Sequence, residues 1–336
     1  MKYILNESPT KTTNNFKVNN VEVDLDICET DFNKYNISNT DSLDAVESIN
    51  ESFTSKIGLD CEKYYLLDIT TKKDYDKIIY IDYDFSRENN FLTTVINLNI
   101  KYDSKFIIKY NGINSFLNLK LVTNIDSNVK CDISFVNTCD KTSTSLVAFE
   151  NYLLDNSKLT INYFDLCGNK RISNYYTELN KDNSISNFNN IYIGSSEDLI
   201  DMNYYTRCCG KNTKCNMNVV GTLNDKSIKT FRGIIDFISG CSNSKGEELE
   251  NCLLLSDDVK SKSLPVILCD EEDVEGVHGV STGKFDSDKL FYLTSRGLSE
   301  DAAKKLIIKS NFSSIINTLE DTSFKEFINN LIDEVI

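Results

Sequence analysis

From about residue 80 onwards, apolar and polar positions alternate along the chain in one short segment after another. The segments are rich in β-branched and aromatic residues, and Asn, Asp, Ser, Gly and Lys separate them. They read IYIDY, TVINLNIK, KFIIKY, FLNLKLVTN, VKCDISFVN, SLVAFENYL, KLTINYFD and SNYYTEL. A period of two is typical of β-strands with one buried face. Because no helical stretch interrupts the series, the pattern predicts a mainly β structure built from many short strands.

Two architectures fit such a series of strands: an antiparallel sandwich or barrel, and a β-helix in which short strands stack into a solenoid. Tight hairpins are scarce, because Asn-Gly occurs once, at Asn111-Gly112, and Asp-Gly never occurs. The polar spacers between the strands suit the corners of a β-helix, where side chains can stack in ladders. The spacing by itself leaves both architectures open.

The two ends of the chain differ from this β body. Residues 1–75 are polar and weakly periodic, and we expect a short, partly ordered segment with one strand at residues 21–27 (VEVDLDI). The β body is predicted over residues 76–285. Residues 286–336 change to a helical period. They are therefore predicted to form a C-terminal helical domain.

Capping residues mark three helices in this last part. We expect Ser287 to cap a short first helix that Gly297 ends, and Ser299 to cap the second. Ser323 begins a capping-box sequence that opens the third helix.

Charge and hydropathy restrict the function. The 336 residues carry 36 Lys and Arg against 51 Asp and Glu, a net charge of −15. This balance argues against sequence-independent binding to nucleic acid or to an anionic membrane. No apolar run approaches the ~18 residues of a membrane span, and the first ten residues lack the apolar stretch of a signal peptide. We expect a soluble, cytoplasmic protein.

The cysteine and histidine content narrows the chemistry. A single histidine, His278, excludes HExxH metalloproteases and three-histidine zinc sites. Eleven cysteines are an odd number, and in a reducing compartment they argue against a disulfide framework. Buried thiols, a metal site and sulfur chemistry remain open.

Most cysteines have a simple packing interpretation, and a few invite another. Cys208-Cys209 followed by Cys215 resembles a metal-binding cluster, but neighbours on a strand point to opposite faces. Cys241 follows a glycine in a loop and is expected to be exposed, whereas Cys269 in PVILC is expected in the core. The others lie in or near β segments and are interpreted as packing residues: Cys28, Cys61, Cys131, Cys139 and Cys167.

Residues 250–312 carry a long, ordered set of motifs. LLLSDD is followed by Pro265 at the start of an apolar strand, then DEEDVEGVHGVSTGKFD, then LFYLTSRGLSEDAAKKLI, with VVGTLNDKSIKTFRGIIDF upstream. This order resembles the SufB/SufD family, the scaffold subunits of the SUF iron–sulfur cluster assembly machinery. The resemblance covers about residues 215–312. The earlier β segments share only a general strand pattern with the family and none of its specific motifs. The N-terminal segment is shorter than the family's usual helical domain.

The resemblance implies a right-handed parallel β-helix with a C-terminal helical domain, and thereby favours the β-helix over the sandwich. It also implies partners: a SufC-type ABC ATPase that docks on the C-terminal helices, a sulfur donor, and a second scaffold subunit. Pairing through the β-helix ends would give a homodimer or a heterodimer. The chain itself would carry a transient iron–sulfur cluster and would not be an enzyme, because ATP hydrolysis belongs to the partner.

Two residues carry over from the family as cluster-binding or sulfur-handling candidates. Cys252 matches the SufB cysteine before the LLL segment, and His278 matches the family histidine. Gly279 is SufD-like, because SufB proteins have glutamate there, and Gly276 stands where many SufD proteins have cysteine. Thiolate and imidazole are accepted cluster ligands. Because residues 26 apart can be neighbours across one solenoid turn, we expect Cys252 and His278 to meet.

Each candidate also has a structural interpretation. A lone histidine in a Gly-rich turn is often a hydrogen-bonding residue, and Cys252 alone would be a buried packing thiol. Cys208, Cys209, Cys215 and Cys241 are weaker candidates for cluster binding or sulfur handling.

The resemblance places the ATPase-binding surface at Phe291, Tyr292, Arg296 and Gly297. The alternative is that these residues pack the helical domain onto the β body. Leu306 and Ile307 are expected in the core. Residues 279–284 do not form a Walker A motif, because only three residues separate the glycines and Phe285 follows the lysine. No nucleotide is therefore expected on this chain.

Two other functions stay open. The chain can be a SufD-like structural subunit that binds no cluster and supports a SufB partner. It can also be a β-solenoid enzyme that acts on polysaccharide, which clustered acidic residues lining a solvent groove would support.

Overall fold

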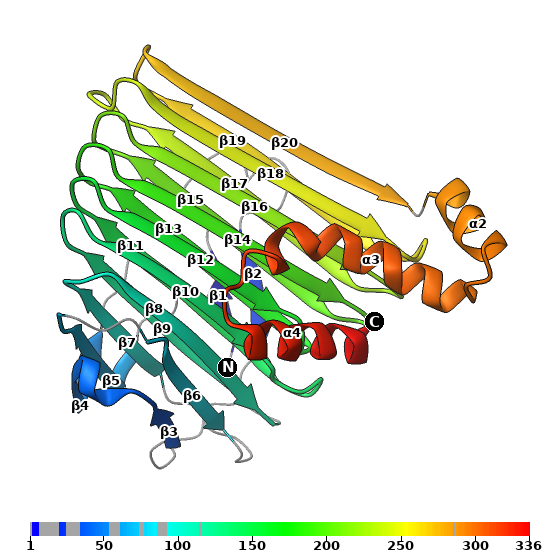
Figure 1. Ribbon diagram of the computed structural model, residues 1–336, viewed down its shortest axis with the longest axis horizontal. Coiled ribbons are helices and arrows are strands. Elements are labelled where there is room, and N and C mark those ends of the chain that lie inside the picture. Colours follow the sequence, from blue (N-terminus) through cyan, green and yellow to red (C-terminus); the bar gives the residue numbers. More distant parts are fainter. Residues whose placement is uncertain are drawn as a thin grey trace.

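The computed structural model describes residues 2–6, 20–24, 34–53, 61–73, 77–85, 93–113, 116–284 and 286–336. Within them the chain forms a parallel β-solenoid of about seven turns, with helices at the C-terminal end of the sequence (Figure 1). From residue 61 onwards successive strands alternate between two sheets, and each strand pairs with the next but one in sequence. The mainly β fold and the choice of a solenoid over a sandwich are therefore confirmed.

Each sheet contains nine of the described strands. Sheet 1 consists of β3 (Lys34–Ile37), β6 (Ile79–Phe85), β8 (Ser104–Gly112), β10 (Lys130–Asn137), β12 (Lys158–Asp165), β14 (Ile185–Gly194), β16 (Lys214–Leu223), β18 (Ser244–Leu254) and β20 (Val274–Lys284). Sheet 2 consists of β4 (Leu43–Phe53), β5 (Cys61–Thr71), β7 (Thr93–Ile100), β9 (Phe116–Ile125), β11 (Thr144–Leu153), β13 (Lys170–Leu179), β15 (Leu199–Cys208), β17 (Ile228–Phe237) and β19 (Lys260–Cys269).

The first strands of the sheets lie before residue 76, where the sequence pattern places the start of the β body. β3 pairs with β6 and β4 pairs with β5, and these two pairs are antiparallel. From β5 and β6 onwards every pair within the two sheets is parallel and in register. The polar first part of the chain thus supplies the beginning of both sheets.

The alternating pattern explains the core between the sheets. Inward positions are apolar in almost every turn, and aromatic rings pack against one another there, mostly edge to face. They include Phe135, Phe149, Tyr163, Tyr175, Phe188, Tyr204 and Phe231. Asparagines at one corner adopt a left-handed backbone, and their amides link successive turns, as Asn183 to Asn156 at 3.0 Å. The polar spacers therefore form the expected ladders.

Two helices cover the outer face of sheet 1. α3 (Glu300–Ile316) and α4 (Thr322–Val335) bury Ile308, Phe312, Phe324, Ile328 and Ile332 against apolar residues of the sheet. α2 (Ser287–Ser295) buries no residue and lies past the C-terminal end of β20, away from the sheets (Figure 1). No helix in the described part of the chain is long and apolar enough to cross a membrane.

The helix caps differ partly from the prediction. Ser299 caps α3 as expected, and Gly297 has the positive φ of a residue that ends a helix. α2 is capped by Asp286 and α4 by Asp321, so the assignments to Ser287 and Ser323 were wrong. In both cases an aspartate slightly upstream accepts the free backbone N–H groups, and its charge suits the positive end of the helix.

A hairpin at the N-terminus covers part of the outer face of sheet 2. β1 (Lys2–Leu5) pairs antiparallel with β2 (Val21–Asp24), so the described part of the predicted strand at residues 21–27 is a strand. Leu5 and Val21 pack against Leu146 and Ile172.

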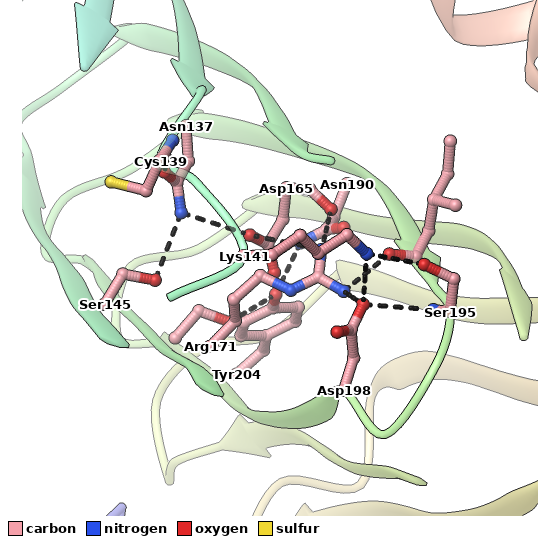
Figure 2. A network of polar contacts seen from close by, with 12 residues as sticks. Asn137, Cys139, Lys141, Ser145, Asp165, Arg171, Asn190, Ser195, Asp198 and Tyr204 are labelled. Carbon is pink, nitrogen blue, oxygen red and sulfur yellow. Dashed lines mark hydrogen bonds and ion pairs between the residues drawn. The ribbon is translucent and has the colours of Figure 1, made fainter. Parts of the chain in front are cut away.

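A buried polar network joins successive turns at another corner (Figure 2). Arg171 is fully buried and donates to the backbone carbonyl oxygens of Asp165, at 2.6 Å, and of Ile193, at 2.5 Å. Its guanidinium also contacts the carboxylates of Asp165 and Asp198 at 3.7 and 3.5 Å. Burial raises the pKa of Asp165, and Arg171 opposes that rise. The network fixes the corner through charges that have no access to water.

Candidate functional site

The end of the solenoid next to α2 is open. β19 and β20 are the last strands of their sheets, so each has a described neighbour on one side only. An edge strand presents unpaired N–H and C=O groups. The side chains of both strands are also partly or fully exposed, and those of Val277 and Val280 in β20 are 53% and 40% exposed. This open end can accept another pair of strands.

Ionisable side chains fill the solenoid interior directly behind the open end. In β18, buried and exposed residues alternate, and the buried ones include Glu248, Glu250 and Cys252. Lys229 of β17 faces them from the other sheet and is fully buried. Such groups are seldom buried unless they are paired. We call Lys229, Glu248, Glu250 and Cys252 the polar cluster.

One carboxylate of the polar cluster, that of Glu250, is paired through its Oε1 atom, whereas its Oε2 atom has no hydrogen-bond partner among the described residues. Glu250 forms an ion pair with Lys229 in which neither side chain is exposed. The Tyr192 hydroxyl donates to Glu250 at 3.1 Å, and the Lys229 ammonium donates to the Ser263 hydroxyl at 2.8 Å. Because β19 supplies Ser263, the pair is linked to the last turn of the solenoid.

Cys252 lies beside this ion pair. Its side chain is buried, and the Ser261 hydroxyl donates to its sulfur at 3.9 Å. Burial raises the pKa of the Cys252 thiol, while the nearby charge of Lys229 lowers it. While Cys252 is buried, its thiol is protonated. Exposure to water would remove the rise in its pKa that burial causes.

Glu248 has no hydrogen-bond partner among the described residues at either carboxylate oxygen. Its carboxyl group occupies the space beside Gly233, where a Cβ atom would lie 2.0 Å from one of its oxygens. Burial, and next the charge of Glu250, raise the pKa of Glu248 to about 8. Glu248 therefore binds a proton near neutral pH.

The structure does not bring Cys252 and His278 together. β18 and β20 pair so that His278 lies opposite Glu248 and Thr282 lies opposite Cys252. Four residues therefore separate the two candidates along the strands, which is about 13 Å at the usual rise per residue. The offset of 26 residues in the sequence does not match the 30-residue step between Glu248 and His278. His278 is exposed at the open end, next to Glu248.

The polar cluster was only partly recognised from the sequence. Cys252 was identified, whereas Lys229, Glu248 and Glu250 were not. The segment GEELENC places the two glutamates and the cysteine at alternate positions, so their shared face could have been read from the period of a strand. The position of Lys229 depends on the pairing of the two sheets.

The other cysteines divide by the face on which they lie. Cys208 and Cys215 face the interior with their sulfur atoms 3.9 Å apart, while Cys209 is on the opposite face and half-buried. Cys241 is buried and Cys269 is exposed, so the two predictions for them were wrong. Cys269 ends β19, and no described strand covers it beyond β19.

The remaining cysteines follow the packing interpretation where they are described. Cys131 and Cys139 are buried and Cys167 is half-buried. Cys28 and the side chain of Cys61 lie outside the described residues. Within the described part of the chain, no group of three or more His, Cys, Asp or Glu side chains is arranged to hold a metal ion.

A second candidate surface lies between α2 and α3. Phe291 and Tyr292 are exposed, and the Arg296 guanidinium lies 5.2 Å from the centre of the Tyr292 ring. Leu306 is also exposed and Ile307 is partly buried, so neither belongs to the core as predicted, because α3 turns other residues to the sheet. A groove of about 500 Å³ is lined by Asp288, Lys289, Tyr292, Leu293, Leu306, Ile307 and Ser310.

A further groove of about 500 Å³ lies where the α3–α4 connection meets the outer face of sheet 1. Two of the carboxylates that line it are already engaged. Glu320 pairs with Lys105, and Asp321 caps α4 and accepts a hydrogen bond from Tyr80 at 2.7 Å. These contacts attach the connection to the sheet.

The architecture is that of a parallel β-solenoid with an open end, ionisable side chains behind that end and C-terminal helices on one sheet. A sequence model of the SUF system FeS cluster assembly, SufBD core domain, matches residues 83–311. Since this is more than half of the chain, the protein belongs to the SufBD family of iron–sulfur cluster assembly proteins.

Individual relatives agree with this assignment. The chain is 26% identical over 165 residues to the iron–sulfur cluster assembly protein SufD of Bacillus subtilis, which is 49% of this chain and 38% of that protein. It is 26% identical over 157 residues to SufD of Escherichia coli, covering 46% and 36%. A SufBD family protein of Mycobacterium leprae is 32% identical over 80 residues, covering 24% and 20%. The matched stretches span less than two fifths of each relative's length.

Proposed function

We propose that the chain is a non-catalytic, cytoplasmic scaffold subunit on which iron–sulfur clusters are assembled. The observation that carries this proposal is the polar cluster behind the open end, which places a thiol beside a buried ion pair. A packing core needs none of these groups, because apolar residues of similar size would fill the space at no desolvation cost. The cluster is cargo in this proposal, and Cys252 and His278 are its candidate ligands.

Because about 13 Å separates Cys252 and His278 along the strands, they act at different stages of cluster assembly or bind different parts of the cluster. The exposed His278 meets iron or a second subunit at the open end. When the last turn opens, loss of burial lowers the pKa of the Cys252 thiol, and the charge of Lys229 favours its thiolate. The thiolate attacks the outer sulfur of a persulfide on the sulfur donor, the donor's own thiolate leaves, and the new persulfide on Cys252 binds iron.

The force for this opening comes from a SufC-type ABC ATPase that docks on the groove between α2 and α3. An exposed aromatic pair beside an apolar groove is suited to a protein partner. α2 follows β20 closely in the sequence, so a movement of the docked helix pulls directly on the open end. ATP-driven dimerisation of two ATPase subunits would in this way strain the two scaffolds that carry them.

Reconstitution tests the cluster role. The protein is incubated anaerobically with iron and sulfide, and its visible spectrum is compared with that of Cys252→Ser. We expect a sulfur-to-iron charge-transfer band in the wild type that the variant loses. Cys131→Ser is the matched control, because Cys131 is equally buried but lies on β10, far from the open end. If the wild type binds no iron, alone or with the ATPase, the cluster role is refuted.

That result would favour a second candidate, a SufD-like structural subunit that binds no cluster and supports a SufB partner. The observation in its favour is that the two longest matches described above are named SufD. Reconstitution of the wild type together with a SufB protein separates the two candidates. A cluster bound only when SufB is present, and unaffected by Cys252→Ser, supports the structural subunit.

A titration with the ATPase tests the docking surface. Phe291→Ala removes the most exposed ring of α2, and at the centre of an interface such a truncation weakens binding by roughly tenfold or more. Isothermal titration calorimetry with the purified ATPase measures the change. Val46→Ala, at another exposed apolar site on β4, is expected to bind like the wild type. Equal affinities of Phe291→Ala and wild type would place the docking site elsewhere.

A further inference from the structure

Two thiols are in contact inside the solenoid, one solenoid turn below the polar cluster. Cys208 is the last residue of β15 and Cys215 the second residue of β16, so they face each other across one corner. Their sulfur atoms are 3.9 Å apart, and both side chains are buried. Only the short corner at residues 209–213 connects them along the chain.

The environment makes the two thiols unequal. Hydrogen bonds from Cys215 and Thr213 lower the pKa of Cys208 against the opposing effect of burial. The hydrogen bond with Cys208, and next burial, raise the pKa of Cys215. Cys208 is therefore the better nucleophile of the pair, and Cys215 holds its proton beside it.

Space around the pair is too tight for a ligand between the thiols and the next turn. The residue above Cys215 in sheet 1 is Gly246, and even a Cβ atom there would lie 3.0 Å from the Cys215 sulfur. The described residues also supply no third metal ligand. The chemistry that remains for two touching thiols is a reaction with each other.

We propose that Cys208 and Cys215 form a redox-active dithiol that a hydroperoxide, such as hydrogen peroxide, closes into an intramolecular disulfide. The Cys208 thiolate attacks one peroxide oxygen, the O–O bond breaks, and the departing hydroxide takes up a proton to become water. The Cys215 sulfur then attacks the resulting sulfenic acid. The S–O bond breaks, a second water leaves with the Cys215 proton, and the S–S bond forms. Both thiols are oxidised and both peroxide oxygens are reduced.

Burial selects the oxidant. Small, uncharged hydrogen peroxide enters through brief openings of a short corner more readily than a peptide or a protein disulfide. The resulting bond joins sheet 2 to sheet 1 across the corner, directly below the solenoid turn that holds Glu248 and Cys252. Formation of the disulfide does not require a bound cluster. A negative result for the disulfide would therefore leave the proposed function untouched, and the reverse also holds.

Peptide mapping tests the proposal on the full-length protein. The reduced protein is treated with hydrogen peroxide, alkylated under denaturing conditions and digested with trypsin, which cleaves after Arg207, Lys211 and Lys214. We expect residues 208–211 linked to residues 215–226 with the loss of two hydrogen atoms, and dithiothreitol should release the two peptides. Because residues 208–211 contain Cys209 as well, the linked pair must persist in Cys209→Ser and disappear in Cys208→Ser and Cys215→Ser.

If Cys208→Ser or Cys215→Ser fails to fold, the digests of the wild type and of Cys209→Ser decide the question, because Cys209→Ser leaves Cys208 as the only thiol in residues 208–211. Retention of both alkylated thiols at peroxide concentrations that oxidise the exposed Cys269 would overturn the proposal. So would a linked pair that Cys209→Ser abolishes, because the reactive thiol would then be on the outer face.

Discussion

Arg171 shows how much one buried charge contributes to this solenoid. It contacts the carboxylates of Asp165 and Asp198 and two backbone carbonyl groups, without exposure to water (Figure 2). Arg171→Ala leaves both carboxylates buried with less compensation, and we expect the free energy of unfolding to fall by about 3–5 kcal/mol. Urea denaturation followed by circular dichroism measures this.

The control for this prediction is Lys141→Ala. Lys141 pairs with the same Asp198 carboxylate at 3.2 Å, but half of its side chain is exposed. A half-exposed ion pair contributes little, and the expected loss is below about 1 kcal/mol. Equal losses in the two variants would mean that burial does not decide the contribution of the network.

Glu248 predicts a pH dependence of stability. Its pKa is about 8 in the folded chain and about 4.3 in an unfolded one, so the folded state binds the proton more tightly. The free energy of unfolding should therefore decrease as the pH rises from about 4 to about 8 and then level off. Glu248→Gln removes this titration while Glu250, Lys229 and His278 remain. We expect the variant to gain stability relative to the wild type across that range.

Thermal unfolding of both proteins between pH 5 and pH 9 measures the difference. Parallel pH profiles would show that Glu248 is ionised in the folded state, which would need a partner for its carboxylate. The expected divergence begins where the unfolded carboxyl group ionises and is complete above about pH 8.

At the residue scale, part of the polar cluster could be predicted from the sequence, and the rest could not for a physical reason. The strand period of two is enough to put Glu248, Glu250 and Cys252 on one face. The partner of each residue in the next strand depends on the number of residues per solenoid turn, and the corners vary in length. The expected meeting of Cys252 with His278 failed on this point, and Lys229 was missed for the same reason.

At the scale of elements, the C-terminal helices differ in their packing, because two of them bury an apolar face on sheet 1 and the third is exposed. α3 and α4 bury an apolar face on sheet 1, and the ring of Phe324 meets that of Phe164 edge-on at 5.9 Å. Phe324→Ala should lower the free energy of unfolding by about 3–5 kcal/mol, because it opens a cavity under α4. Phe291→Ala on α2 should change it by less than about 0.5 kcal/mol, because that ring is 74% exposed.

Chemical denaturation of both variants measures the contrast between the two helices. A large loss in Phe291→Ala would mean that α2 is held by contacts in the free protein, and its ring would then be unsuited to docking. The helical period gave the existence of all three helices from the sequence. The helical period did not predict which helix would pack on the sheet, because α2 and α3 both carry apolar residues. The path of the chain after β20 decides that α3 packs on the sheet and α2 does not.

At the scale of the whole molecule, a solenoid must deal with its two ends, because each turn contacts only its neighbours. The chain closes its first turns with the antiparallel pairs β3–β6 and β4–β5. The described residues place nothing comparable over β19 and β20, whose outer backbone edges have no described neighbour and where Val277 and Val280 are exposed. Backbone groups in this position are prone to pair with another chain.

We therefore predict that two copies of the chain associate through β19 and β20. Val280 lies opposite the inward-facing Glu250 at the open end, so an aspartate there would add a further carboxylate beside Glu248 and Glu250 in the dimer interface, and Val280→Asp should weaken association by roughly tenfold or more. Val46→Asp on β4 makes the same change at an exposed valine near the other end of the solenoid and should leave association unchanged. Sedimentation velocity over a range of concentrations compares the three proteins, and hydrogen exchange should show protection of the β19 and β20 amides that rises with wild-type concentration. A wild type that stays monomeric, with rapid exchange in both strands at every concentration, would contradict self-association through the open end.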